Sequence, residues 1–515
     1  MNDMSVTAGS RAVLERDEPL PASPGVRSGA DYLRDLQDGR TVIVDGRRVP
    51  NIVEDPRFRG IARTVAAMYD FAADPDNGMQ FSNPETGGTT LKPYMIPRSA
   101  QDFAARREAI GKWSALTGGF VGRSPDHVAG LFAGFAGGAQ VFRRDGFDGS
   151  DNVVAWYRKI ASESRFVAYA ITPPQTSRVP DAHEGDEPLQ VAVVRSEPDG
   201  IVVRGAQMLA TSAAVADLLF VSCIQPLAPG DEKHALSFIL PVNTPGLRLY
   251  CRRPYASRTG DDGYDYPLTA RFDESDAVLV FDDVFVPREN IFVCQDVDGV
   301  REQFYATPAH AFSNHQAQVR LVTKLKFVLG VARKVCAAHQ SDTTPSVVEK
   351  LGELASFAAL VEASTVAAES MAALDANGVM VPNRRFLYGA MGLQSEIYPR
   401  VIQIFRELVG GGPIQMPSSR HEMLNEETRD DMRRYARSKG ATAEDRVQLL
   451  KLAWDVIGSE FGSRHVQYEM FYAGPPFVAR MMSMRYYDYR EPVGMVDAFL
   501  STYGPENPDG RLGTS

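Results

Sequence analysis

An arginine followed directly by a strong helix start is the first candidate for chemistry, in residues 119–127. Ser124 can cap a helix, Pro125 suits its first position and Asp126 suits its first turn. Free N–H groups at a helix N-terminus favour anions, and the Arg123 guanidinium adds a positive charge beside them. These residues predict an anion-binding site at Arg123, although a surface arginine before an ordinary helix also fits the local sequence.

Two further segments place polar side chains where an α-rich region gives way to a β-rich one. Residues 168–178 form a Pro- and Thr-rich loop, and residues 205–212 finish a strand with polar side chains. Ligands commonly bind at junctions between domains, so the loop is a second candidate, with a plain connection as the alternative. The strand end by itself indicates only where a strand stops.

The sequence lacks the usual motifs for several other kinds of site. It has no GxGxxG before a helix, no GxxxxGK[ST], no HExxH and no GxSxG, so it gives no evidence for a Rossmann dinucleotide site, a P-loop, a zincin or a hydrolase elbow. The eight histidines show no metal spacing, since even His310 and His315 fall on different helical faces. We therefore expect neither a nicotinamide site nor a metal.

Composition and charge indicate a large soluble protein of several domains. The chain has 515 residues, of which 65 are acidic and 55 basic, and a formal net charge of −10. This acidic balance disfavours a nucleic-acid partner. No apolar run approaches the ~18 residues of a membrane helix, the N-terminus lacks a secretory signal, and the four cysteines form no CxxC pair. We expect no membrane association, no disulfide framework and a cytoplasmic location.

Hydrophobic periodicity divides the chain into a tail and three domains. Residues 1–28 contain three prolines and few bulky apolar side chains, which predicts a flexible tail. Residues 29–170 show mainly helical periodicity, interrupted by a hairpin with an Asp-Gly turn. Residues 171–298 change to a period of two with frequent turn signals, which predicts a β barrel or sandwich. Residues 299–515 return to helical periodicity and predict a helical bundle, with long helices across residues 321–335, 351–361 and 447–461.

Five motifs stand in a fixed order along the chain: YLRDLQDGR at 32–40, GRSPD at 122–126, GIVVRGA at 200–206, FDDVFVP at 281–287, and LAWD with EFGSR at 452–455 and 460–464. Together they resemble the 4-hydroxyphenylacetate 3-hydroxylase family. Its members are the oxygenase components of two-component flavin-dependent monooxygenases, and they include chlorophenol and nitrophenol oxygenases. The resemblance covers nearly the whole chain after the tail.

The resemblance implies a fold and a mechanism. The fold is α+β and acyl-CoA dehydrogenase-like, with an N-terminal α domain, a middle β barrel and a C-terminal four-helix bundle, assembled into homotetramers. A separate NAD(P)H:flavin reductase supplies reduced flavin, as FAD with FMN as the alternative. The oxygenase adds O2 to form a C4a-hydroperoxide and hydroxylates a phenolic substrate ortho to its hydroxyl group. Such a chain needs a water-free cavity and a group that draws off the phenolic proton, but no nicotinamide site.

The resemblance also assigns cofactor-binding residues. Arg123 matches the family arginine near flavin and substrate, and Thr211 matches the hydroxyl expected at flavin N5. Thr172 and Gln175 match the loop over the isoalloxazine, and Arg178 ends that loop.

The catalytic residues depart from the family pattern. Where hydroxyphenylacetate hydroxylases commonly have a tyrosine four residues after the arginine, this chain has His127. Where they have a histidine just before the Pro-containing loop, it has Tyr169. This exchange can preserve a His/Tyr hydrogen-bonding pair with reversed roles, because either ring can bridge to a phenolate. His315 falls at or beside a histidine that some members use and is an alternative base, with a structural role as the other interpretation.

Other functions remain open at this point. A dehalogenating or denitrating phenol oxygenase would hydroxylate the carbon that bears the leaving group. A non-catalytic flavin-binding homologue is disfavoured because Arg123, Thr211 and at least one histidine candidate are present. The 4-hydroxybutyryl-CoA dehydratases share the fold but bind an iron–sulfur cluster through closely spaced cysteines, which this chain lacks. The sequence leaves open which phenol is hydroxylated and whether it is free or carrier-bound.

Overall fold

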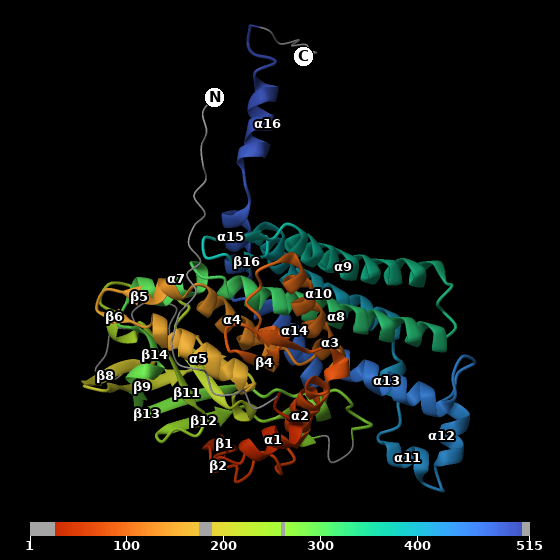
Figure 1. Ribbon diagram of the computed structural model, residues 1–515. Coiled ribbons are helices and arrows are strands. Elements are labelled where there is room, and N and C mark those ends of the chain that lie inside the picture. Colours follow the sequence, from red (N-terminus) through yellow and green to blue (C-terminus); the bar gives the residue numbers. More distant parts are fainter. Residues whose placement is uncertain (1–25, 175–187, 259–262, 507–515) are drawn as a thin grey trace.

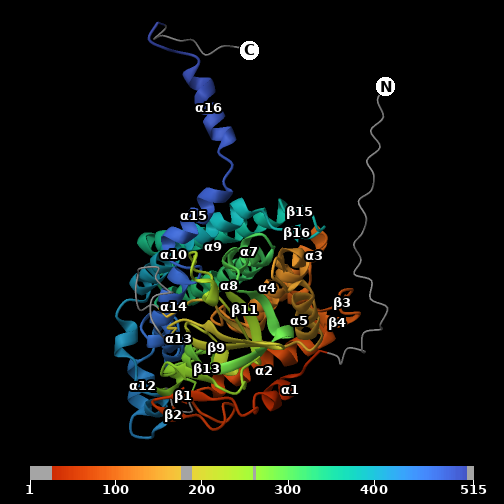
Figure 2. The ribbon, with the colours of Figure 1, turned by 90° about the vertical axis from the view of Figure 1, so that its left-hand side faces the viewer.

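Two helical regions enclose a β-rich centre in the computed structural model, which describes residues 26–174, 188–258 and 263–506 (Figure 1, Figure 2). The first region holds five helices: α1 (Gly29–Asp35), α2 (Arg59–Ala73), α3 (Ala100–Leu116), α4 (Pro125–Gly137) and α5 (Ser150–Ser162). Short hairpins connect them: β1 (Val42–Val44) with β2 (Arg47–Arg48), β3 (Gln80–Asn83) with β4 (Gly88–Leu91), and β5 (Arg143–Arg144) with β6 (Phe147–Asp148). Gln175, Arg178 and the first 25 residues of the predicted tail lie outside the described residues.

The β-rich centre consists of two sheets. The larger has the order β2-β1-β12-β13-β9-β8, and the smaller has the order β14-β11-β10-β7. Their strands are β7 (Val167–Ala170), β8 (Ala192–Glu197), β9 (Gly200–Gln207), β10 (Leu218–Ser222), β11 (Leu236–Pro241), β12 (Leu247–Cys251), β13 (Ala277–Pro287) and β14 (Ile291–Cys294), with α6 (Thr269–Phe272) between β12 and β13. An isolated antiparallel bridge between Thr172 and Met208 connects the β7 edge of one sheet to the end of β9 in the other.

The C-terminal region is a bundle in which α8, α9 and α10 lie side by side (Figure 1). Its elements are α7 (Val297–Tyr305), α8 (Ala309–Ala338), α9 (Pro345–Ser370), β15 (Ala373–Leu374), β16 (Met380–Val381), α10 (Arg384–Val409), α11 (Arg420–Leu424), α12 (Arg429–Tyr435), α13 (Ala443–Ile457), α14 (Glu460–Phe471), α15 (Pro476–Tyr486) and α16 (Arg490–Leu500). Helix α16 stands away from the bundle in both ribbon views (Figure 1, Figure 2).

The predicted hairpin after α1 forms, but one of its strands belongs to the central β region. Asp45 and Gly46 adopt the positive φ angles of 51° and 71° that their tight turn requires. On its other side, β1 runs parallel to β12, with Val42 opposite Leu249. The N-terminal region therefore supplies a strand to the larger sheet, through a long-range pairing that local periodicity does not reveal.

Close packing fixes α4, the helix that begins just after Arg123. Phe132 packs against Phe220 of β10 and Phe292 of β14, with ring centroids 5.6 and 5.8 Å apart. On the opposite side α4 approaches α8, and a Cβ added at Gly134 would lie 2.3 Å from the Ala309 backbone. Only glycine allows this contact, so the sheet and the bundle together hold α4 in place.

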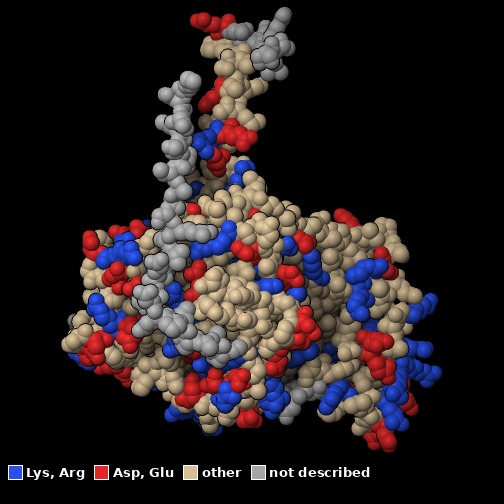
Figure 3. Space-filling view, in the orientation of Figure 1, with Lys and Arg blue, Asp and Glu red and all other residues tan. Residues whose placement is uncertain are grey.

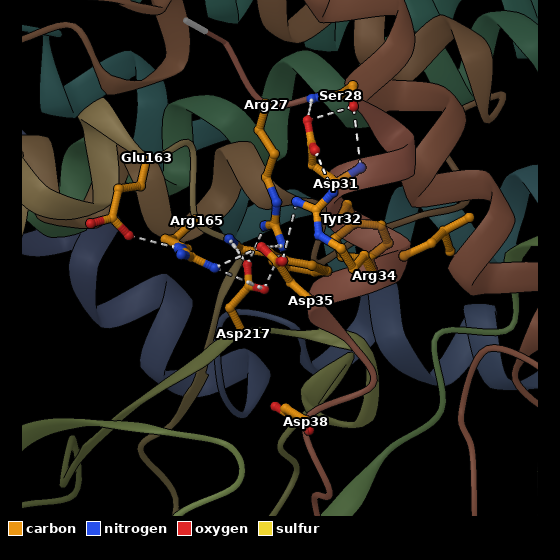
Figure 4. A network of polar contacts seen from close by, with 12 residues as sticks. Arg27, Ser28, Asp31, Tyr32, Arg34, Asp35, Asp38, Glu163, Arg165 and Asp217 are labelled. Carbon is orange, nitrogen blue, oxygen red and sulfur yellow. Dashed lines mark hydrogen bonds and ion pairs between the residues drawn. The ribbon is translucent and has the colours of Figure 1, made fainter. Parts of the chain in front are cut away.

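The described residues begin before the predicted end of the tail. Arg27 is buried, and its guanidinium donates to Asp217 at 2.6 and 2.9 Å and to Asp35 at 3.0 Å (Figure 4). Arg165 contacts the same Asp35 carboxylate at 3.1 Å. The next residue, Ser28, caps α1. The prediction of a flexible tail is therefore wrong for residues 26–28, because an ion-pair cluster with a distant loop orders them.

The single helix predicted across residues 447–461 is two helices. Helix α13 ends at Ile457, and α14 begins at Glu460, where the Ser459 side chain accepts from the Gly462 N–H at 2.9 Å. Between them, a Cβ at Gly458 would lie 2.4 Å from the Trp454 ring. The apolar periodicity continues across the break, so periodicity alone predicted one helix where a glycine and a serine cap end one and start another.

Helix α9 is long and apolar enough to cross a membrane by length and composition, with a mean hydropathy of 1.3 over 18 residues, of which 28% are buried. It packs against α8 and α10 as a member of the bundle. Basic and acidic residues are intermixed on the face shown in Figure 3. The outer face of α9 keeps large apolar side chains exposed, among them Leu360 and Val366.

Candidate active site

Arg123 lies where all three regions of the chain meet. Its guanidinium carbon is 4.9 Å from the ring centroid of Tyr169 on β7, and 5.4 and 4.9 Å from those of Tyr468 and Tyr472 at the end of α14. Its backbone N–H donates to Glu274 of the β region at 2.5 Å. Three aromatic rings thus surround a half-buried cation, and cation–π attraction stabilises its charge there.

His127 lies one helical turn after Arg123 and contacts it directly. The Arg123 Nη1 is 2.9 Å from His127 Nε2, and the His127 ring stacks on Tyr169 with centroids 5.5 Å apart. Burial, and next the Arg123 charge, hold the pKa of His127 well below its ordinary value of 6.5. Burial raises the pKa of Tyr169, although Arg123 opposes that shift. The structure therefore brings together three of the predicted site residues, with both rings uncharged at neutral pH.

Tyr468 of α14 and Tyr472, which directly follows that helix, belong to this site, although no motif in the sequence predicted them. The Tyr472 hydroxyl donates to Asn314 on α8 at 2.5 Å. The Tyr468 hydroxyl is buried and has no hydrogen-bond partner among the residues that the structure describes. A Cβ at Gly122 would lie 2.5 Å from that hydroxyl, so a larger residue just before Arg123 would displace the Tyr468 ring. The GRSPD motif contains Arg123, and the EFGSR motif lies at the start of α14. Neither motif predicts that Arg123 contacts the two tyrosines at the other end of α14.

Thr211 lies in a second group of polar residues, which is connected to the first. Its hydroxyl donates to Asp276 at 2.7 Å, and Asp276 also accepts from Arg464 of α14 at 2.7 Å. Burial alone would raise the pKa of Asp276, but Arg464 and Arg252 hold it below its ordinary range. Arg464 also reaches Glu274 at 3.1 Å, the same carboxylate that accepts from the Arg123 backbone. Ion pairs thus join the Thr211 loop to the Arg123 site.

The backbone around Thr211 has an unusual shape. Leu209 and Ser212 adopt φ angles of 60° and 64°, which non-glycine residues rarely do. Leu209 is 58% exposed although it is a large apolar side chain. Nearby, Met208 N–H donates to the Thr172 carbonyl at 2.9 Å, so the bridge between the sheets holds the described start of the predicted flavin loop beside this turn.

The structure does not bring His315 to this group. Its Nε2 is 2.7 Å from Glu369 of α9, and its ring meets Phe103 of α3 edge-on at 4.9 Å. Burial lowers the pKa of His315, although Glu369 opposes that shift. The next residue, Gln316, is the one that reaches His127, at 3.0 Å. Successive helical residues point about 100° apart, so an offset of one residue sends the side chain to a different interface.

The residues present fit a reduced flavin. Its ring system is flat and largely apolar, and its pyrimidine edge carries negative charge in the reduced form. Arg123 supplies positive charge, Thr211 supplies a hydroxyl, and the tyrosine rings supply flat apolar surface. The buried Tyr468 hydroxyl is a polar group with capacity for one more hydrogen bond. The fold and this site define a flavin-dependent oxygenase of the α, β, α architecture.

Comparison with known proteins gives the family. The profile of the 4-hydroxyphenylacetate 3-hydroxylase N-terminal region matches residues 28–293, and that of its C-terminal region matches residues 300–501. The chain belongs to this family, the oxygenase components of two-component flavin-dependent aromatic monooxygenases. The family assignment made from the five motifs is therefore confirmed.

Individual relatives extend over almost the whole chain. A pyoverdin chromophore biosynthetic protein of Pseudomonas aeruginosa is 33% identical over 92% of this chain and 94% of its own. The 4-hydroxyphenylacetate 3-monooxygenase oxygenase component of Thermus thermophilus is 33% identical over 90% of this chain and 95% of its own. A crystal structure of such an oxygenase with FAD and 4-hydroxyphenylacetate superposes with a TM-score of 0.87, at 32% identity over 92% of this chain and 98% of its own. The predicted architecture is confirmed.

Proposed function

We propose that this chain hydroxylates a phenol ortho to its hydroxyl group, using FAD that a separate NAD(P)H:flavin reductase has reduced. The observation that carries the proposal is the Arg123 guanidinium, enclosed by Tyr169, Tyr468 and Tyr472 and bonded to His127. The solved relative with FAD and 4-hydroxyphenylacetate supports the same pair of ligands.

Each side chain of the site has its own role in the proposed reaction. Bound reduced flavin supplies the chemistry that activates O2. Arg123 stabilises negative charge on the ligand through charge-assisted hydrogen bonds. The Tyr169 hydroxyl can hydrogen-bond a phenolic hydroxyl, which raises the electron density of the ring to be hydroxylated, while His127 contacts Arg123. The three rings around Arg123 are half-buried and limit its contact with water, which strengthens the electrostatic contacts inside the site.

The flavin is expected to be reduced elsewhere. The purified chain mixed with NADH and FAD should therefore show no more NADH oxidation than the mixture without protein. Addition of a generic NADH:flavin reductase should start hydroxylation, with O2 consumed. Rapid NADH oxidation by the chain alone would contradict the two-component assignment.

We further propose that the protein is a homotetramer. Helix α9 leaves Leu360 and Val366 exposed, and helix α16, which stands away from the bundle, exposes Met495 and Phe499 at 68% and 57% (Figure 1). Apolar surface of this extent favours burial against other subunits. Light scattering at micromolar concentration should give about four times the chain mass of 56.5 kDa, and a stable monomer would contradict the proposal.

The cellular location that we propose is the cytoplasm. There the reductase and its nicotinamide substrate are available, and the four cysteines of the chain, all free in this structure, remain reduced.

The experiment that tests the function is a panel of phenols, assayed with a generic flavin reductase, NADH and O2, with products identified by mass. We expect at least one phenol to gain one oxygen atom at an ortho carbon that carried hydrogen. Release of halide or nitrite from substituted phenols would instead indicate the dehalogenating or denitrating alternative. Flavin binding without any product across the panel would indicate a non-catalytic homologue.

A further inference from the structure

A chain of hydrogen bonds leads from Arg123 into the protein interior. Arg123 Nη1 lies 2.9 Å from His127 Nε2, and His127 Nδ1 lies 3.0 Å from Gln316 Oε1. Gln316 Nε2 donates to Asp126 Oδ1 at 3.0 Å, and the Ser124 hydroxyl donates to the same oxygen. Gln316 and Asp126 are fully buried, so no solvent competes for these groups.

Asp126 at one end and Arg123 at the other fix the order of donors and acceptors in this series of hydrogen bonds. An ionised Asp126 only accepts hydrogen bonds, which directs the Gln316 NH2 group toward it and the Gln316 oxygen toward His127. That oxygen accepts, so His127 must carry a proton on Nδ1. At the other end the Arg123 guanidinium only donates, so His127 Nε2 must offer a lone pair. A neutral imidazole with its proton on Nδ1 satisfies both neighbours.

The charges around Asp126 favour the ionised form that this order requires. Burial raises the pKa of Asp126 to about 6, still below neutral pH, and the hydrogen bonds from Ser124 and Gln316 oppose that rise. Arg106 on α3 adds a buried positive charge nearby, with its guanidinium 4.7 Å from the Phe312 ring centroid. Both Nη atoms of Arg106 have no hydrogen-bond partner among the described residues, so its charge is not neutralised by a closer carboxylate there.

We propose that Asp126 and Gln316 are positioning residues that hold His127 as the neutral Nδ1–H tautomer, so that its Nε2 lone pair orients the Arg123 guanidinium at the site. In this arrangement His127 acts as a fixed hydrogen-bond acceptor, and in the free enzyme it is not a proton-accepting base, because its lone pair is already engaged. The inference rests on the proposed function only for its kinetic test.

The tautomer can be observed directly in the full-length protein labelled with 13C and 15N at histidine. Solid-state carbon–nitrogen correlation spectra identify which ring nitrogen carries the proton, and the His127 signals are those lost in His127→Gln. The decisive variant is Arg123→Met, which removes the donor to Nε2 but leaves Gln316 in place. We expect His127 to remain Nδ1–H in it. Appearance of the Nε2–H tautomer in Arg123→Met would overturn the proposal.

A matched pair of glutamine variants then tests the role of Gln316, at the interior end of this series of hydrogen bonds. In the Arg123→Met background, Gln316→Met should release His127 into a mixture of tautomers. Gln318→Met removes another fully buried glutamine of α8, one that donates to Gln394 at 2.9 Å, and it should leave His127 as Nδ1–H. A mixture in both double variants, or in neither, would show that Gln316 does not set the tautomer.

Kinetics of His127 variants separate positioning from base catalysis. The amide of His127→Gln can accept from Arg123 and donate to Gln316, so it should retain coupling of flavin oxidation to hydroxylation within about threefold, with an unchanged pH profile. His127→Leu should lose coupling by on the order of tenfold or more, the loss of one hydrogen bond to a charged group. Equal losses in both variants would indicate a base and overturn the proposal. Absence of any hydroxylation in the wild-type chain would refute the proposed function, whereas the tautomer measurement would still test this inference.

Discussion

Replacement of Arg123 by alanine is expected to lower the fraction of reduced flavin that ends in hydroxylated product by on the order of ten- to a hundredfold. Charge-assisted hydrogen bonds from this guanidinium to the ligand are worth ~1.5–3 kcal/mol each, and about 1.4 kcal/mol corresponds to a factor of ten. The lost product should appear as H2O2. Parallel measurement of product and H2O2 per NADH, with a generic reductase, gives this coupling ratio.

Two further substitutions control for this result. Arg123→Lys keeps the charge but loses the planar guanidinium, so it should recover only part of the coupling. Arg204→Ala removes an arginine of β9 whose contacts are with exposed Asp283, and it should couple like the wild-type protein. Wild-type coupling in Arg123→Ala would make this residue an ordinary arginine at a helix start and would refute the site assignment.

Replacement of Glu469 by glutamine should destabilise the folded protein by about 3–5 kcal/mol, the usual cost of leaving buried charges without a partner. Glu469 of α14 pairs with Arg320 at 2.7 Å and with Lys324 at 2.8 Å, and all three side chains are fully buried. Arg320 also donates to the Gly119 carbonyl and lies over the Tyr468 ring, so the same cluster supports the Arg123 site. Denaturant unfolding of the assembled protein measures the effect.

The pH dependence of the stability difference between the wild-type protein and Glu469→Gln provides a second check. Burial would raise the pKa of Glu469, but its two cationic partners hold it at about 2, below its ordinary value of 4.5. A lowered pKa in the folded state contributes stability above pH 4.5, which is lost as pH falls toward 2. The difference in free energy of unfolding between the wild-type protein and Glu469→Gln should therefore become smaller as pH falls over this range. Glu396→Gln breaks an exposed pair with Arg480 and should change stability little. Equal effects of the two variants would contradict the assigned role of Glu469.

Local signals in the sequence predicted the parts of the site that depend on adjacent residues. The Ser-Pro-Asp sequence after Arg123 predicted the start of α4, and the structure begins that helix at Pro125. Comparison with the family pattern predicted a hydrogen-bonding pair of His127 and Tyr169. The two side chains do lie together, but their rings stack, and the His127 nitrogens contact Arg123 and Gln316 instead. The Asp-Gly turn of the first hairpin was also predictable, because that turn requires two residues with positive φ.

Long-range contacts were not predictable from periodicity. Gln316, Tyr468 and Glu274 reach the Arg123 site from other regions of the chain, and none has a local sequence signal that specifies its partner. His315 was selected because histidine is a recognisable chemical group, whereas the neighbouring glutamine is the side chain that faces His127. Successive helical residues point in different directions, so the rotation of α8 about its own axis relative to α4 decides which of these two side chains faces His127.

Hydroxylation by chemically reduced FAD under 18O2, with no reductase and no NADH present, is the most direct test of the central claim. The chain, a phenol identified by the panel and reduced FAD are mixed with 18O2, and the product is analysed by mass spectrometry. We expect an ortho-dihydroxy product whose new hydroxyl group carries one 18O atom. A product without 18O, or no product when reduced FAD is shown to bind, would contradict this claim.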